Sequence, residues 1–103
     1  MIYNKLVRDR IPEIIVRSGK RCVTEVLSDA EYLKMLDAKL EEELGEYRKD
    51  QTMEELADLL EVIYASAAAR GYTSQQLECV RAEKLAERGG FQQKILLKEV
   101  IEE

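Results

Sequence analysis

Two short acidic clusters lie close together in the chain, EELGE at residues 42–46 and ELAD at residues 55–58. Acidic residues three positions apart on a helix share one face, so Glu43 would lie beside Glu46, and Glu55 beside Asp58. Like charges at this spacing destabilise a helix by about 0.2–0.5 kcal/mol per pair. The repeated crowding therefore predicts a cation between the clusters, and oxygen ligands favour Mg²⁺ or Mn²⁺.

A solvated acidic face is the alternative interpretation of these residues. Two features argue against it: the spacing occurs twice, and three acids, Glu55, Asp58 and Glu61, interrupt a helix that is otherwise suited to burial, where an unpaired carboxylate is costly. Glu55 also occupies the third position of a capping box that begins at Thr52, so capping accounts for part of its presence. Both interpretations stay open at this point.

Four helices are expected to position these acids. Capping residues, Pro12 and the spacing of apolar residues predict helices over about residues 11–17, from Ser28 to beyond Tyr47, over 52–70, and from Thr73 to about 88. Because only residues 50–52 connect the second and third helices, these two should be antiparallel neighbours. Both acidic pairs would then converge at the edge of a helical bundle, close to the connection.

The remaining segments complete an expected fold that is mainly all-α. Residues 21–27 and 95–100 are predicted to be short strands that pair as a small two-stranded β-ribbon beside the helices. The helix over residues 52–70 is apolar almost all round, which predicts burial at the centre of a bundle or across a subunit interface. A chain of 103 residues has room for a single domain, and residues 1–103 are expected to form one.

Composition excludes several classes of function. The net charge of −5 makes a nucleic acid polymer an unlikely partner. The sequence has no histidine and only two cysteines, Cys22 and Cys79, which excludes zinc sites and histidine-dependent triads and dyads. Both cysteines are expected to be small core residues. A secretory signal and an apolar run of about 20 residues are both lacking, so no membrane contact and a cytoplasmic location are predicted.

Basic residues at both ends of the sequence could neutralise a polyphosphate. They are Lys5, Arg8 and Arg10 near the start, and Lys84, Arg88 and Lys94 near the finish. A single basic residue of this kind is more often an ordinary surface charge. Their role therefore depends on the metal site.

The two acidic runs together resemble the EExxE and ExxD signature of the MazG-like, all-α nucleoside triphosphate pyrophosphohydrolases. The opening YNKLVRDRIPEII and the late EKLAERGGF are similar to the two ends of a small single-domain, house-cleaning subgroup. The resemblance implies that Glu43, Glu46, Glu55 and Asp58 bind Mg²⁺, with Glu42 and Glu61 as accessory groups. It implies that Lys84 and Arg88 face phosphates, and it gives Lys5, Arg8 and Asp9 a place in the opening motif.

Such an enzyme would cleave a nucleoside triphosphate between its α- and β-phosphates, giving a monophosphate and pyrophosphate. Glu42, Glu43 and Glu46 are the candidate catalytic residues, with a carboxylate as base and a metal that activates water. The resemblance also implies an antiparallel helical bundle completed by dimerisation. Only eight residues separate Glu46 from Glu55, fewer than is typical of MazG proteins, which leaves the preferred base and sugar open.

Two alternative functions remain at the level of sequence. One is phosphoribosyl-ATP pyrophosphohydrolase, which uses the same chemistry on a single substrate. The other is a non-catalytic helical module that dimerises or binds a regulatory metal ion.

Overall fold

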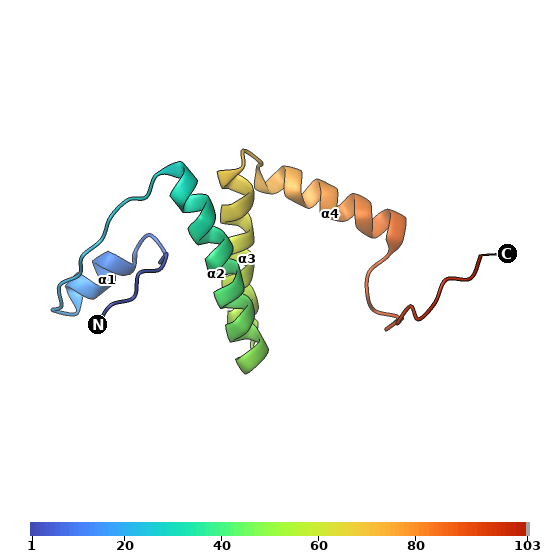
Figure 1. Ribbon diagram of the computed structural model, residues 1–103, viewed down its shortest axis with the longest axis horizontal. Helices are drawn as coiled ribbons and strands as arrows, with labels where there is room; N and C mark the ends of the chain where they lie inside the picture. The colour runs from blue at the N-terminus through green and yellow to red at the C-terminus, as the bar shows by residue number, and fades with distance from the viewer. Residues whose placement is uncertain (103) are drawn as a thin grey trace. The chain divides into compact units, whose positions relative to one another are not determined.

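The computed structural model describes residues 1–102, and these residues form four α-helices and no β-strand (Figure 1). The helices are α1 (Ile11–Arg17), α2 (Asp29–Asp50), α3 (Met53–Ala69) and α4 (Ser74–Arg88). The predicted all-α class is confirmed. The chain divides into two compact units, Met1–Tyr72 and Thr73–Glu103. None of the helices in the described part combines the length and the apolar character that crossing a bilayer requires.

Side chains at the N-terminal ends cap three of the helices, as the sequence predicts. The Ser28 hydroxyl accepts a hydrogen bond from the Glu31 N–H at 3.2 Å, and the Thr52 hydroxyl accepts one from the Glu55 N–H at 3.3 Å. At α4 both halves of the capping box are present, between Thr73 and Gln76. Because capping satisfies backbone groups within three residues, sequence spacing locates these helix starts well.

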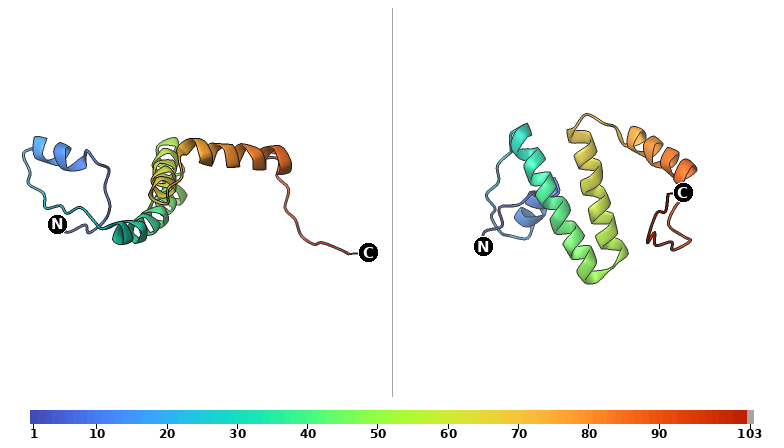
Figure 2. Two further views of the ribbon diagram at one scale, coloured as in Figure 1. Left: turned by 90° about the horizontal axis from the view of Figure 1, so that it is seen from above. Right: turned by 45° about the vertical axis from the view of Figure 1, so that its right-hand side comes forward.

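α2 and α3 form an antiparallel hairpin, which the right-hand view in Figure 2 shows. Two residues connect them, and Gln51 adopts a left-handed conformation with φ of 56° while its N–H donates to the Tyr47 carbonyl at 2.7 Å. Within residues 1–72, this hairpin is the one place where helices pack on each other. Leu36 of α2 and Val62 of α3 are its buried core residues.

Within residues 1–72, α3 is covered on one side only, whereas the sequence predicts burial at the centre of a bundle or across a subunit interface. The side toward α2 carries Val62, which is 8% exposed. The outward side carries Leu56, Leu60, Ile63 and Tyr64, which are 36–48% exposed. A second apolar face is thus present on α3, but no other helix of residues 1–72 covers it.

The two predicted strands are absent from the described residues. Residues 21–27 and 95–100 have no regular secondary structure, so the predicted β-ribbon is not found. Val23 and Val26 are fully exposed, and Ile95, Leu96 and Leu97 are 74–79% exposed. A short strand needs a paired strand and an apolar surface to cover, and these segments have neither within their own unit. Cys22 and Cys79 are likewise exposed rather than buried in a core.

Candidate functional site

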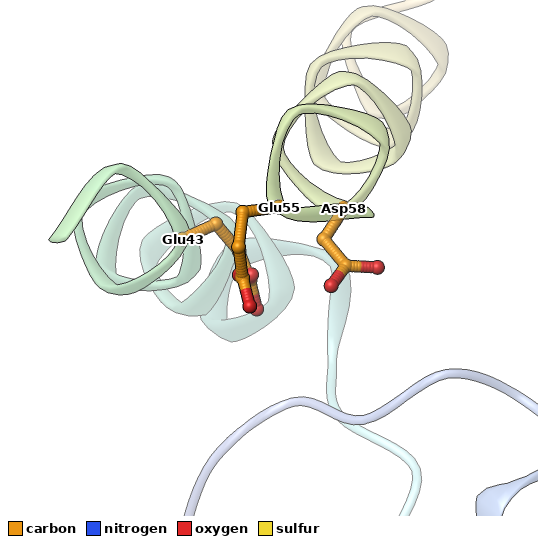
Figure 3. A group of neighbouring side chains, drawn as sticks. All are labelled: Glu43, Glu55 and Asp58. Atoms are coloured by element: carbon orange, nitrogen blue, oxygen red, sulfur yellow. The ribbon is translucent and has the colours of Figure 1, made fainter. Parts of the chain in front are cut away.

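Three carboxylates meet where the two helices of the hairpin approach their connection. Glu43 extends from α2, and Glu55 and Asp58 extend from the start of α3 (Figure 3). One carboxylate oxygen of each lies within 4.8 Å of the others, and all three residues are half-buried. We call Glu43, Glu55 and Asp58 the acidic site. Its members come together because the two-residue connection places the last turns of α2 beside the first turns of α3.

A second group of carboxylates shares Glu55 with the acidic site. It consists of Glu46, Asp50 and Glu55, again with one oxygen of each within 4.8 Å. The four predicted ligands therefore do not form one compact set, because Glu46 joins Asp50 instead of Asp58. Asp50 was not among the predicted residues. Its position four residues after Glu46 on the same helix was the signal that could have revealed it.

Basic side chains of the same unit pair with several of these acids. Lys39 reaches Glu43 at 3.2 Å and Glu42 at 3.4 Å. Lys5 donates to Glu42 at 2.9 Å, and Arg8 donates to Asp58 at 2.7 Å. Glu42, expected to be an accessory or catalytic group, is thus an ion-pair residue and belongs to neither carboxylate group. The structure records no ion pair for Glu55 among residues 1–102.

The pKa values of Glu55 and Glu42 shift in opposite directions. The pKa of Glu55 is raised, first by partial desolvation and then by repulsion from Asp58, Asp50, Glu46 and Glu43. The pKa of Glu42 is lowered, chiefly by the hydrogen bond from Lys5, and the pKa of Lys5 is raised by the same bond. An added cation would relieve the repulsion at Glu55, whereas Glu42 already has a cationic partner.

Three further predicted site residues are Glu61, Lys84 and Arg88. Glu61 is exposed on α3 and belongs to neither carboxylate group. Lys84 and Arg88 are exposed residues of α4, in the second unit. Their expected contact with phosphates stays a prediction.

The donor atoms of the acidic site suit a hard divalent cation. All are carboxylate oxygens, which Mg²⁺ and Mn²⁺ prefer, and the site offers none of the nitrogen or sulfur ligands that zinc selects. Ligand oxygens at about 2.0–2.1 Å from Mg²⁺ lie roughly 3–4 Å from each other. Oxygens within 4.8 Å can reach such positions by small side-chain rotations. Acidic groups of this kind are also common without an ion, so the fit alone assigns no metal.

Fold and site define a small all-α protein whose helical hairpin carries an acid-rich site near its connection. No known protein family matches the chain, and no solved structure matches it. An uncharacterized protein of Mycolicibacterium smegmatis is similar to it, with 56% identity over 48 residues. The matched segment is 47% of this chain and 49% of that protein, so it spans about half of each.

Proposed function

We propose that the protein is a cytoplasmic, Mg²⁺-dependent nucleotide pyrophosphohydrolase that cleaves nucleoside triphosphates into a monophosphate and pyrophosphate. The observation that carries this proposal is the convergence of Glu43, Glu55 and Asp58 from two helices within 4.8 Å. The resemblance of both acidic runs and both flanking motifs to the MazG-like enzymes supports it further. House-cleaning of aberrant or surplus nucleotides is the role that fits this chemistry.

Different carboxylates of the site have different proposed roles. Glu43, Glu55 and Asp58 would hold Mg²⁺, with Glu46 beside them through its approach to Glu55. When bound, Mg²⁺ polarises phosphate oxygens and lowers the pKa of water. Glu46 is exposed, and no ion pair to it is recorded within residues 1–102, so it is the carboxylate best placed to accept the proton of the attacking water.

Basic residues would bind the negative charge of the substrate. Arg8 lies at the acidic site through Asp58, and Lys5 lies beside it through Glu42. A guanidinium binds phosphate oxygens through two parallel hydrogen bonds, and an ammonium binds them as a compact charge. Lys84 and Arg88 of α4 are proposed as further phosphate contacts, on the strength of the motif resemblance.

A substrate screen tests the proposal directly. The purified protein is incubated with a panel of nucleoside triphosphates and Mg²⁺, and release of pyrophosphate is measured. We expect release by the wild type and its loss in Glu43→Gln and in Asp58→Asn. Glu54→Gln is the matched control, because Glu54 is exposed on the same first turn as Glu55 but belongs to neither carboxylate group. Inactivity over the whole panel, with no stabilisation by Mg²⁺, would contradict the proposal.

The same screen separates the alternative functions. Hydrolysis of phosphoribosyl-ATP alone would assign the protein to that single-substrate reaction. Thermal stabilisation by Mg²⁺ without hydrolysis of any nucleotide would assign a non-catalytic metal-binding module, because a ligand that binds only the folded state raises the melting temperature.

The active form is proposed to be a homodimer in which α3 packs against a second copy. Leu36 and Val62 are the buried apolar residues of the described chain, which is a small core for a protein of this length. The outward side of α3 leaves Leu56, Leu60, Ile63 and Tyr64 36–48% exposed. Covering this face with the same face of a second hairpin would give a four-helix arrangement with a continuous core.

A further inference from the structure

The first ten residues are attached to both helices of the hairpin through ion pairs. Lys5 binds Glu42 on α2 with an Nζ–Oε1 distance of 2.9 Å, and Arg8 binds Asp58 on α3 with an Nη2–Oδ1 distance of 2.7 Å. The segment has no helix of its own before Ile11. Residues 1–10, which we call the N-terminal segment, thus connect two acids that belong to or border the acidic site.

The pair between Arg8 and Asp58 places a positive charge on a residue of the acidic site. Asp58 offers an oxygen to the Glu43 and Glu55 group and also accepts the hydrogen bond from Arg8. A guanidinium cannot lose its proton at ordinary pH, so it would repel any divalent cation that approaches Asp58. Arg8 and a metal ion therefore compete for the same carboxylate.

A metal ion would compete with only one of the two ion pairs of the N-terminal segment. The side chains of Arg8 and Asp58 are 57% and 42% exposed, and an ion pair this open to water is weak and easily exchanged. Glu42 has a second basic neighbour in Lys39 and stands outside both carboxylate groups. A metal at the acidic site would consequently displace Arg8 and leave the contact of Lys5 with Glu42 in place.

We infer that the N-terminal segment is an electrostatic strap, in which Arg8 neutralises Asp58 until Mg²⁺ binds and then turns to the triphosphate while Lys5 keeps the segment anchored. This inference rests on the proposed function and describes regulation of the same site. Mg²⁺ alone binds against the competition of Arg8, whereas Mg²⁺ with a triphosphate gains a phosphate contact from the released guanidinium. By linkage, the metal and the nucleotide each strengthen the binding of the other.

Titration calorimetry with Mg²⁺ in the absence of nucleotide tests the competition. We expect Arg8→Gln to bind Mg²⁺ about two- to fivefold more tightly than the wild type, the range that corresponds to loss of an exposed ion pair. With Mg²⁺ present, the same variant should bind a non-hydrolysable triphosphate more weakly. Arg17→Gln is the matched control, because it removes one exposed arginine that pairs with Glu13 on α1. If Arg8→Gln binds Mg²⁺ no more tightly than Arg17→Gln does, the inference is wrong.

Nuclear magnetic resonance of the arginine side chain tests the strap without relying on activity. The Nε–H signal of Arg8, assigned by its loss in Arg8→Gln, should shift in a chelator-treated Asp58→Asn variant and should shift in the wild type when Mg²⁺ is added. An unchanged signal in Asp58→Asn would show that the pair does not form. If Mg²⁺ shifts the signal but no nucleotide is hydrolysed, the proposed function fails and the competition between Arg8 and Mg²⁺ for Asp58 stands. If hydrolysis occurs while Mg²⁺ leaves the signal unmoved, the strap fails and the proposed function stands.

Discussion

At the scale of single residues, Glu55 holds the central position among the acids. It belongs to both carboxylate groups, and it is the member whose pKa is raised by desolvation and by four acidic neighbours. Asp58 and Glu43 each have a basic side chain nearby, Arg8 and Lys39. Glu55 is thus repelled by four acids and has no recorded ion pair within residues 1–102.

Replacing Glu55 should remove this repulsion and stabilise the metal-free protein. A raised pKa means that the folded state disfavours the ionised carboxylate, and the loss of stability grows as pH rises through the folded-state pKa. We expect Glu55→Gln to raise the melting temperature of the chelator-treated protein at pH 7 and to abolish any stabilisation by Mg²⁺. Thermal melts with chelator and with Mg²⁺ measure both effects. A lower melting temperature in chelator would show that the attraction between the Glu55 charge and the helix N-terminus outweighs the repulsion.

The ion pair between Lys5 and Glu42 should make the stability of the protein depend on pH in the opposite direction. Because the pKa of Glu42 is lowered in the folded state, the pair stabilises the protein above the unfolded pKa, and this stabilisation is lost as pH falls through the folded-state value. We expect Lys5→Gln to raise the pKa of Glu42 in an NMR titration of the metal-free protein. The wild type should be more stable at pH 7 by at most about 1 kcal/mol, because the pair is partly exposed. The two proteins should converge in stability at low pH.

At the scale of elements, α2 carries the candidate residues and also contains a glycine in its interior. Gly45 lies beside Glu43 and Glu46, and the sequence leaves open whether it permits a close approach of backbones or is a tolerated surface residue. A Cβ atom built at Gly45 has no atom within 4 Å, and the residue is exposed. Within the described chain, Gly45 therefore has no steric reason to be glycine.

Substituting alanine at this position should stabilise the helix. Glycine in a helix interior costs about 0.5–1 kcal/mol relative to alanine, because it loses more backbone entropy on folding. We expect Gly45→Ala to raise the free energy of unfolding by that amount in urea denaturation. Gly71→Ala is a contrasting control, since φ of 88° at Gly71 is strained for alanine and should make that variant less stable. Loss of stability in Gly45→Ala would indicate that a second copy of the chain approaches α2 at this point.

At the scale of the whole molecule, the hairpin has more apolar surface than one chain buries. Only one side of α3 faces α2, and the outward side presents four large apolar residues at helical spacing. Apolar residues exposed singly are ordinary, but a contiguous apolar face on one helix marks an interaction surface. This is the physical basis for the proposed dimer.

A lysine on the outward face of α3 should separate the dimer. Leu60 and Ile63 are 45% and 36% exposed in the single chain, and a charge at either position would be buried without a counter-ion in the dimer. We expect Leu60→Lys and Ile63→Lys to elute as monomers in size-exclusion chromatography with light scattering. Val16→Lys, an exposed substitution on α1, should keep the mass of a dimer. A monomeric wild type would refute the assembly.

Several features could be predicted from particular residues because their causes are local. Helix starts at Ser28, Thr52 and Thr73 follow from hydrogen bonds that span three residues. α1 ends just before Gly19, because Gly19 has a positive φ, which glycine adopts readily and a helix does not contain. The strands at 21–27 and 95–100 could not be predicted reliably, because a strand depends on a distant paired segment rather than on its own residues.

The sequence by itself determined that four helices form and that acids share faces on two of them, since both depend on spacing along one helix. Tertiary structure decided which acids meet. The register between α2 and α3 places Glu43 with Glu55 and Asp58, and leaves Glu46 with Asp50. It also decided that Lys5 and Arg8 reach Glu42 and Asp58, 37 and 50 residues away. Such contacts depend on the path of the chain through space, which no local spacing encodes.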